Sequence, residues 1–209
     1  MPGWPEEPDG VRTWLGRPAS EVAPELLGWR LSHATSEGTV TVELTEVEAY
    51  LGEDDPASHA FRGRTPRNLV MFGHAGHLYT YLSYGMHWCC NVVTGVDGHA
   101  SAVLLRAGRV VEGTELARSR RGERVRDPGL ARGPGCLGQA LGLGREHNGA
   151  DLLGSGALRL APPEAAVDLE VRSGHRVGVR LAHDVPWRFW VADDPTVSAY
   201  KRSPRAVPD

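Results

Sequence analysis

The alternation of apolar and polar positions predicts mainly short strands and a few helices. Runs typical of strands are bounded by Gly, Pro, Asn and Asp turns. They cover residues 29–34, 39–50, 78–83, 87–94, 100–107, 176–182 and 187–191. Helices are predicted at residues 20–27, 110–121 and 134–143. Because strands and helices do not alternate regularly, we expect an α+β fold rather than a doubly wound sheet.

Three segments lack this periodicity. The first ten residues are rich in Pro, Glu and Gly, and we expect a flexible tail over residues 1–15. A second flexible tail is expected at 201–209, which leaves residues 16–200 as one domain, a size that suits a single core. The third segment, 52–68, predicts a long loop, and such loops inside a compact domain are usually functional or disordered.

The composition is that of an ordinary globular protein, with 41% hydrophobic and 23% charged residues. No apolar run approaches the roughly 20 residues that span a bilayer, and the first residues lack the pattern of a signal peptide. Cys89, Cys90 and Cys136 cannot all pair, so a disulfide framework is not expected. We therefore expect a cytoplasmic protein that does not bind membranes.

The formal net charge of -3 is unevenly distributed along the chain. Residues 1–60 hold 12 acidic and 3 basic residues, whereas residues 106–132 hold eight arginines and four acids. This asymmetry fits a surface that faces an anion such as the phosphates of a nucleic acid. It equally fits an arginine-rich helix and loop in contact with water.

The segment Thr-Glu-Val-Glu-Ala-Tyr at 45–50 is the first candidate for chemistry. On a strand, Glu46, Glu48 and Tyr50 share one face, and they lead directly into the long loop that carries His59. Two carboxylates and a tyrosine on one face, directly before a long loop, are unusual for side chains that only contact water. By alternation alone, the same pattern also fits the solvated outer face of a half-buried strand.

A second candidate is the predicted hairpin formed by residues 78–94. Tyr79 and Tyr81 share one strand face, while Tyr84 stands at the tip beside Gly85. We expect Tyr79 in the core. An aromatic side chain at a hairpin tip is hard to bury in its own domain, so Tyr84 is available as a wedge that unstacks a DNA base step.

The histidines and cysteines offer a third candidate, a metal site. His74 and His77 stand three apart, but Gly73 and Gly76 place them in a loop. The sequence His87-Trp-Cys-Cys offers further ligands, yet adjacent cysteines on a strand point to opposite faces. We therefore expect no metal and no cofactor, with a metal-dependent hydrolase using the three histidines kept as an alternative.

Taken together, these motifs resemble those of the alkyladenine (3-methylpurine) DNA glycosylase family. The resemblance is carried by TEVEAYLGEDDPASHAFRGRTPRNLVMFGHAGHLYTYLSYGMHWCCNVVTG at 45–95, SAVLLRA at 101–107 and RGPGCLGQALGL at 132–143. It continues through RVGV at 176–179 and PWRFWV at 186–191. It implies a single compact domain around a curved, mainly antiparallel sheet, with a protruding β-hairpin and flanking helices.

The resemblance also implies roles for individual residues. Glu48 matches the carboxylate that activates the attacking water. Tyr50 and His59 match one side of the pocket for the extruded base, and Tyr81 matches the other side. Asn91 matches a residue of the pocket floor that acts as a filter against normal guanine.

Further matches concern DNA. Tyr84 matches the side chain that enters the duplex, and Arg106 and Arg67 match residues that hold the DNA or the flipped nucleotide. The chain departs from the family pattern at Cys136, where lysine is common, at Thr196, where tryptophan is usual, and at the acidic pair Asp193-Asp194. These departures bear on DNA affinity more than on chemistry.

The implied activity is base excision repair. The enzyme would flip 3-methyladenine or 7-methylguanine, with hypoxanthine and ethenoadenine as further candidates, out of double-stranded DNA and hydrolyse the N-glycosidic bond as a monomer. Lys201 is the only lysine, near the predicted tail, so we expect a monofunctional glycosylase without lyase activity. The alternative is a binding module of the same fold that recognises damaged DNA without catalysis.

Overall fold

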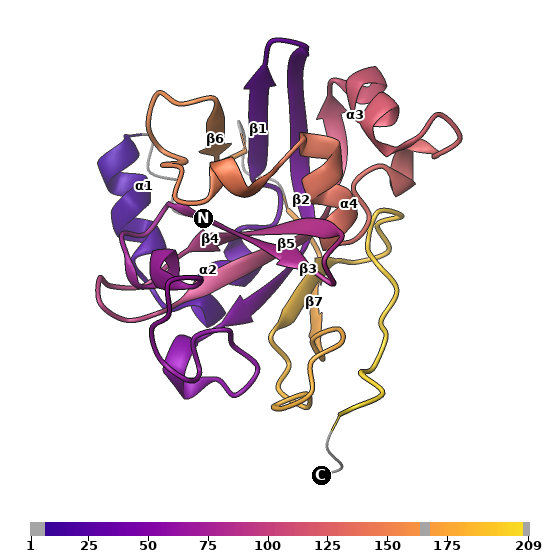
Figure 1. Cartoon of the computed structure of the whole chain (residues 1–209). Coiled ribbons are helices and arrows are strands. Elements are labelled where there is room, and N and C mark those ends of the chain that lie inside the picture. Colours follow the sequence, from indigo (N-terminus) through magenta and orange to yellow (C-terminus); the bar gives the residue numbers. More distant parts are fainter. Residues whose placement is uncertain (1–6, 164–167, 207–209) are drawn as a thin grey trace.

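One curled antiparallel sheet runs through the computed structural model, which describes residues 7–163 and 168–206 (Figure 1). Its strands are β1 (Arg30–Thr35), β2 (Gly38–Tyr50), β3 (Leu78–Ser83), β4 (His87–Val93), β5 (Ala102–Glu112), β6 (Leu158–Ala161), β7 (Val171–Gly174) and β8 (Arg188–Val191). The order is β3-β4-β5-β2-β1-β6, and β8 joins β2 to β7. The expected α+β fold with a curved, antiparallel sheet is confirmed.

The central strand β2 changes partners along its length. Residues 38–43 pair with β1, whereas Glu46, Val47 and Glu48 pair with β8, and β5 follows the other edge. The β2–β5 register shifts around Glu46, as at a β-bulge. Residues 44–49 are all buried, so this end of β2 is covered on both faces. The segment with the two glutamates is therefore interior, and the solvated outer face is excluded.

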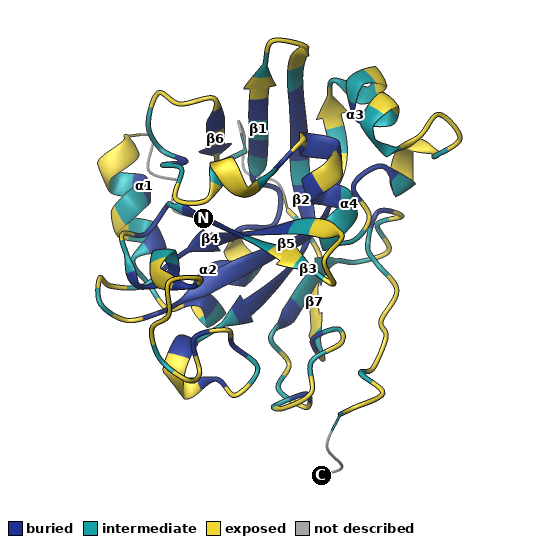
Figure 2. Ribbon diagram, in the orientation of Figure 1, coloured by how far each residue is buried: buried dark blue, intermediate teal, exposed yellow. Residues whose placement is uncertain are grey.

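Four α-helices flank the sheet within the described residues: α1 (Pro8–Leu15), α2 (Ala19–Glu25), α3 (Thr114–Arg121) and α4 (Pro134–Leu141). Four short 3-10 helices occupy the loops, η1 (Gly52–Asp54), η2 (Leu69–Phe72), η3 (Asp127–Gly129) and η4 (Arg145–His147). None of the helices in these ranges is long and apolar enough to cross a membrane. Burial is concentrated on the sheet and on the inner helix faces (Figure 2).

The main core lies between the helices and the sheet. Leu15, Val22 and Leu137 contribute from α1, α2 and α4, and Val47 and Val103 contribute from the central strands. Helix α4 packs so closely on β4 that a Cβ added at Gly138 would lie 2.0 Å from the Trp88 carbonyl oxygen. This packing supports the strands that carry the predicted site.

The structure corrects the prediction of an N-terminal tail over residues 1–15. Residues 8–15 form α1, in which Pro8 stands in the first turn and Val11 and Leu15 are buried one helical turn apart. The proline-rich start suggested a tail because a single pair of core residues is a weak periodic signal. Residues 1–6 of the predicted tail lie outside the described residues.

Two other predicted elements were wrong. The helix expected at 110–121 begins only at Thr114, because the β-branched Val110 and Val111 continue β5 and Gly113 turns the chain with a positive φ of 72°. The strand expected at 176–182 is an irregular segment, which Gly178 (φ 72°) and Ala182 (φ 47°) interrupt. Strands β6 and β7 were not predicted.

The long loop at 52–68 is ordered by side chains that bond the backbone. Asn68 Nδ2 donates to the carbonyls of His59 and Gly63, and Asn68 Oδ1 accepts from the Thr65 amide. Gly52 starts the loop with a φ of 62°, and a Cβ there would lie 2.1 Å from the Ala100 carbonyl oxygen. Only glycine fits that turn, which directs the chain from β2 over the site.

Candidate active site

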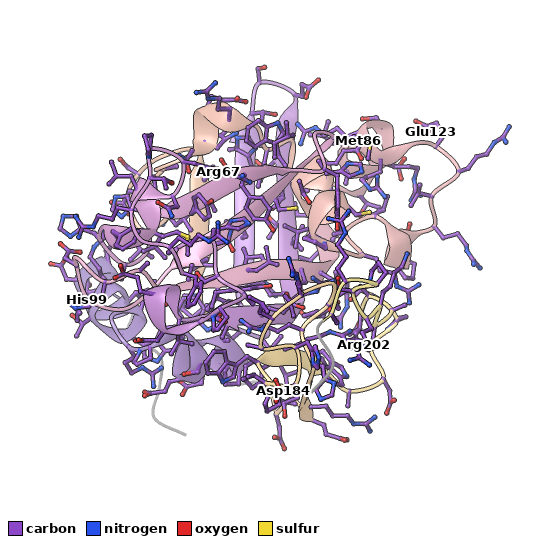
Figure 3. The ribbon with its side chains drawn as sticks, turned by 60° about the horizontal axis from the view of Figure 1, so that its bottom comes forward. Arg67, Met86, His99, Glu123, Asp184 and Arg202 are labelled. Carbon is purple, nitrogen blue, oxygen red and sulfur yellow. The ribbon has the colours of Figure 1, made fainter. Side chains whose placement is uncertain are left out.

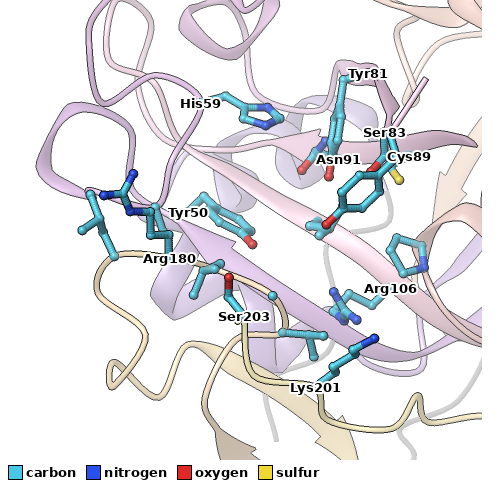
Figure 4. A pocket seen from close by; sticks show the side chains of 18 of the residues that line it. Tyr50, His59, Tyr81, Ser83, Cys89, Asn91, Arg106, Arg180, Lys201 and Ser203 are labelled. Atoms are coloured by element: carbon cyan, nitrogen blue, oxygen red, sulfur yellow. The ribbon is translucent and has the colours of Figure 1, made fainter. Parts of the chain in front are cut away.

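A cavity of about 860 Å³ opens where β2, β3, β4 and β5 meet the loop after β2 (Figure 4). Six of the predicted site residues line it directly, namely Tyr50, His59, Tyr81, Tyr84, Asn91 and Arg106. Two segments from the end of the chain, 177–181 and 201–204, form the remaining wall. Residues far apart in sequence are thus brought together around one cavity.

Glu48 lies behind this wall, fully buried and surrounded by hydrogen-bond donors. Its Oε1 accepts from the Val177 amide at 2.7 Å and lies 3.3 Å from Arg106 Nη1. Its Oε2 accepts from the Tyr50 hydroxyl at 2.8 Å. All three partners line the cavity; Tyr50 and Val177 donate hydrogen bonds and Arg106 adds a positive charge, which suits an ionised carboxylate.

Glu46 points to the same side of β2 but has a different environment. It accepts from Arg106 Nε and Arg188 Nε, both at 2.8 Å, and from the amide and hydroxyl of Ser198. Burial alone would raise the pKa of Glu46, but the two guanidiniums and the Ser198 amide outweigh it and lower the pKa. Glu46 is therefore part of a buried network of ion pairs and hydrogen bonds. Of the two glutamates, Glu48 is the one beside the cavity.

Arg106 joins the two glutamates. Besides its contacts with them, its Nη2 donates to Ser198 Oγ at 3.2 Å, and the residue is only 6% exposed. Burial alone would lower the pKa of Arg106, but the charges of Glu48 and Glu46 outweigh this effect. The pKa is therefore raised above its ordinary value, and the guanidinium stays charged. Its positive charge is largely compensated by these two carboxylates.

The walls of the cavity are aromatic. The His59 and Tyr81 rings meet edge to face at 4.6 Å, and Tyr79 stacks behind Tyr81 at 5.9 Å (Figure 4). Burial raises the pKa of Tyr50 and Tyr81 well above the ordinary value. Both hydroxyls therefore stay protonated at neutral pH.

His59 is held in the neutral form. Burial, with a smaller contribution from the charge of Arg67, lowers the pKa of His59. Its Nδ1 lies 3.1 Å from the hydroxyl of Tyr79, which is 1% exposed, as the sequence predicted for a core tyrosine. A neutral imidazole allows a cationic ligand between the rings without charge repulsion.

Two further predicted residues have clear positions. Asn91 is buried on β4, and its Nδ2 donates to the Tyr79 carbonyl at 3.1 Å, which fixes the direction of the amide at the cavity. The guanidinium of Arg67 lies 6.0 Å from the centre of the Tyr81 ring, at the outer edge of the same wall.

Tyr84 stands at the tip of the β3–β4 hairpin with 88% of its surface exposed. Tyr84 and Gly85 both have positive φ, 50° and 69°, and the Met86 amide donates to the Ser83 carbonyl at 3.0 Å. This is the geometry of a type I′ turn. Met86, on the same tip and labelled in Figure 3, is also exposed.

Sequence analysis did not identify Arg176, which joins several segments around the site. Arg176 is fully buried, forms a bidentate ion pair with Asp55, and donates to the Ala49 carbonyl at 3.0 Å. Its guanidinium lies 4.7 Å from the Tyr50 ring and 5.2 Å from the Trp187 ring. One sequence signal could have pointed to Arg176: it is the first residue of the RVGV segment at 176–179, which is part of the family resemblance.

Lys201 was also misplaced by the sequence. It was expected in a flexible tail, yet residues 201–204 line the cavity, and the Lys201 carbonyl accepts from the Gly178 amide at 2.9 Å. No local pattern could have shown this, because a tertiary contact places the segment.

The histidines proposed for a metal site do not assemble. His74 Nδ1 lies 2.6 Å from the Asp97 carboxylate, His77 bonds the His74 carbonyl, and His87 stands on β4 against Gly135. Among the described residues, no three His, Cys, Asp or Glu side chains are arranged to hold a metal ion. The donor set required by a metal-dependent hydrolase is therefore not formed by these residues.

The arginine-rich segment is mostly used for internal contacts. Arg118 pairs with Asp127, Arg120 with Glu37, and Arg109 with Glu43 and Asp194. This favours a structural role for these arginines over a free surface for anions. The loop that follows α3, marked by Glu123 in Figure 3, projects from the body.

The departures from the family pattern have structural partners. Cys136 Sγ accepts from Arg121 Nη2 at 2.9 Å. Thr196 is buried and shares a 2.6 Å hydrogen bond with Thr45, and Asp194 pairs with Arg109 at 2.7 Å. The acidic charge of Asp194 is thus compensated within the fold.

Comparisons with known proteins find relatives over most of the chain. A family model described as methylpurine-DNA glycosylase matches residues 13–195. A protein of Cutibacterium acnes is 54% identical over 88% of this chain and 96% of its own length. Relatives from Streptomyces avermitilis (48% identical, 94% of each chain) and Frankia casuarinae (49%, 95% of each) are similar throughout. All three are provisionally named 3-methyladenine DNA glycosylases. The chain belongs to the methylpurine-DNA glycosylase family.

Proposed function

We propose that the protein flips an alkylated purine out of duplex DNA and hydrolyses its N-glycosidic bond. The observation that carries this proposal is the placement of Glu48, a buried carboxylate that accepts two hydrogen bonds and pairs with Arg106 directly behind a cavity with aromatic walls. A base inside a duplex leaves no room for attack at C1′, so extrusion must come first.

The aromatic walls supply the binding energy for the flipped base. Purines methylated at N3 or N7 carry a positive charge, which the faces of Tyr50 and Tyr81 attract through cation–π interaction. Stacking on aromatic rings contributes roughly 1–3 kcal/mol per base. Neutral His59 does not oppose the charge. Asn91, with its amide fixed by Tyr79, is proposed to exclude normal guanine at the pocket floor.

Glu48 is proposed to activate the attacking water. Each carboxylate oxygen can accept two hydrogen bonds, and Oε2 receives one from Tyr50 within the described residues, so a water can donate the second. The carboxylate then accepts the proton of this water and stabilises the positive charge that develops on the sugar. The alkylated base leaves without protonation because it is already charged.

Two further residues are proposed to act on the DNA. Tyr84, exposed at the hairpin tip, would enter the gap that the base leaves. Arg67, at the outer edge of the Tyr81 wall, would contact the backbone. We further propose that the enzyme works as a monomer in the cytoplasm or on the nucleoid.

We propose 3-methyladenine and 7-methylguanine as substrates, with hypoxanthine and ethenoadenine as further candidates, and a monofunctional reaction. Hydrolysis needs only water and Glu48, so no amine has to attack the sugar. The product would be an abasic site in an intact strand.

The test is a single-turnover assay with EDTA present, on duplexes that each carry one of these four bases. We expect release of the free base and an abasic site that breaks only after alkali treatment. Damage-selective binding without release of any of the four bases would favour the binding module. Strand cleavage without alkali would contradict the monofunctional assignment.

A further inference from the structure

The cavity has one cationic side that the base does not require. Arg106, Arg180, Lys201 and Arg202 line it, and Figure 4 shows Lys201 and Arg106 facing the side formed by His59 and Tyr81. An alkylated purine is itself cationic, so free positive charge here would repel it. The anionic parts of a flipped nucleotide are its phosphates.

The side chains of Arg106 and Arg202 already have polar partners, whereas those of Lys201 and Arg180 have none within the described residues. Arg106 is bound by Glu46 and Glu48, and Arg202 Nη2 lies 3.3 Å from His183 Nε2. The Lys201 ammonium has no hydrogen-bond or ion-pair partner within residues 7–163 and 168–206. It is therefore free to bind an anion that enters with the DNA.

The backbone of Lys201 is nevertheless fixed. Its carbonyl accepts from Gly178, the residue next to Val177, and Val177 donates to Glu48. Figure 3 shows Arg202, the next residue, on the C-terminal segment. The backbone of Lys201 is thus linked to the Glu48 carboxylate through two hydrogen bonds and the peptide bond between Val177 and Gly178.

Resting on the proposed function, we propose that Lys201 binds a backbone phosphate beside the flipped nucleotide and helps to hold it over Glu48. Lysine binds phosphate as a compact point charge and needs no bidentate geometry. The C-terminal segment then forms part of the DNA-binding surface, opposite the aromatic walls.

The experiment measures equilibrium binding of the full chain to a duplex with a tetrahydrofuran abasic analogue, at several salt concentrations. Lys201→Gln should weaken binding about 3- to 10-fold, and the slope of log K against log salt should fall by about 0.9, the value for one lost phosphate contact. Lys201→Arg should restore both. Arg205→Gln is the matched control, because Arg205 lies on the same segment but outside the cavity lining.

A methylphosphonate duplex locates the contact. Neutralising the phosphate immediately 5′ or 3′ to the analogue should weaken wild-type binding at one of these positions, and Lys201→Gln should abolish that effect. An unchanged salt slope in Lys201→Gln would overturn the proposal, as would borohydride trapping, on a duplex with a natural abasic site, of a covalent complex that Lys201→Gln removes. Base release by the wild type, measured in parallel, tests the proposed function separately.

Discussion

Tyr84 combines exposure with an unfavourable backbone conformation. Its φ of 50° lies in the left-handed region, where a residue with a Cβ costs roughly 1–2 kcal/mol. Asn or Asp is preferred at this position of a type I′ turn, so the tyrosine is not there for the stability of the hairpin. Observed strain of this kind is a reason to look for a function, which the proposed wedge supplies.

Replacing Tyr84 with Asn should therefore separate stability from activity. We expect the free energy of unfolding to rise by about 1 kcal/mol, because the turn loses its strain. Single-turnover excision at subsaturating enzyme should fall at least tenfold, because nothing fills the gap in the duplex. Urea unfolding and base release measure the two effects. Tyr84→Phe is the control and should resemble the wild type in both, so equal loss of activity in Tyr84→Phe would argue against the wedge.

At the residue scale, the sequence predicted which side chains lie close together but not which partners each of them binds. Alternation placed Glu46 and Glu48 on one face, and both do contact Arg106. Only the structure shows that Glu46 accepts hydrogen bonds from Arg188 and Ser198, which are more than 140 residues away in the sequence. Such partners follow from tertiary packing, for which a single sequence carries no local pattern.

The irregular segment 176–182 is the element that completes the site. Its sequence alternates like a strand, but the positive φ of Gly178 and Ala182 breaks the extended backbone. Arg176 anchors it to Asp55 and Ala49, so Val177 is held against Glu48. By contrast, β2 and the β3–β4 hairpin were predicted correctly, because alternation and turn residues are local signals.

Arg176 should act as a positioning residue. Arg176→Met breaks a buried ion pair and leaves Asp55 uncompensated, which costs about 3–5 kcal/mol of unfolding free energy. The double variant with Asp55→Leu should recover part of this stability, measured by urea unfolding. Single-turnover excision at saturating enzyme should stay about 10²-fold low in both variants, because the Glu48 environment is displaced. A stable double variant with wild-type excision would contradict the positioning role.

At the scale of the whole molecule, two histidines whose pKa is lowered in the folded state link stability to pH. Burial lowers the pKa of His33, whose Nδ1 lies 2.7 Å from the Leu141 carbonyl, and it likewise lowers the pKa of His59. Just below the ordinary histidine pKa, the unfolded chain then binds more protons than the folded one. Stability must therefore fall as the pH decreases through that range.

Unfolding by urea at pH 7.5 and about pH 5.5 checks this expectation. These values lie above the range in which carboxylates usually titrate, so the histidines dominate the change. The wild type should lose stability at the lower pH. His33→Asn, whose amide can still donate to the Leu141 carbonyl, should lose less. An equal loss in the variant would show that His33 does not contribute.

The most direct test of the account compares wild type with Glu48→Gln in single-turnover base release, on a duplex that the wild type cleaves at the glycosidic bond. Glutamine keeps the size of Glu48 but cannot accept a proton from water. The account predicts a fall of at least about 10²-fold in excision, with binding to a tetrahydrofuran duplex within about twofold of wild type. Excision at the wild-type rate by a folded Glu48→Gln enzyme would contradict it.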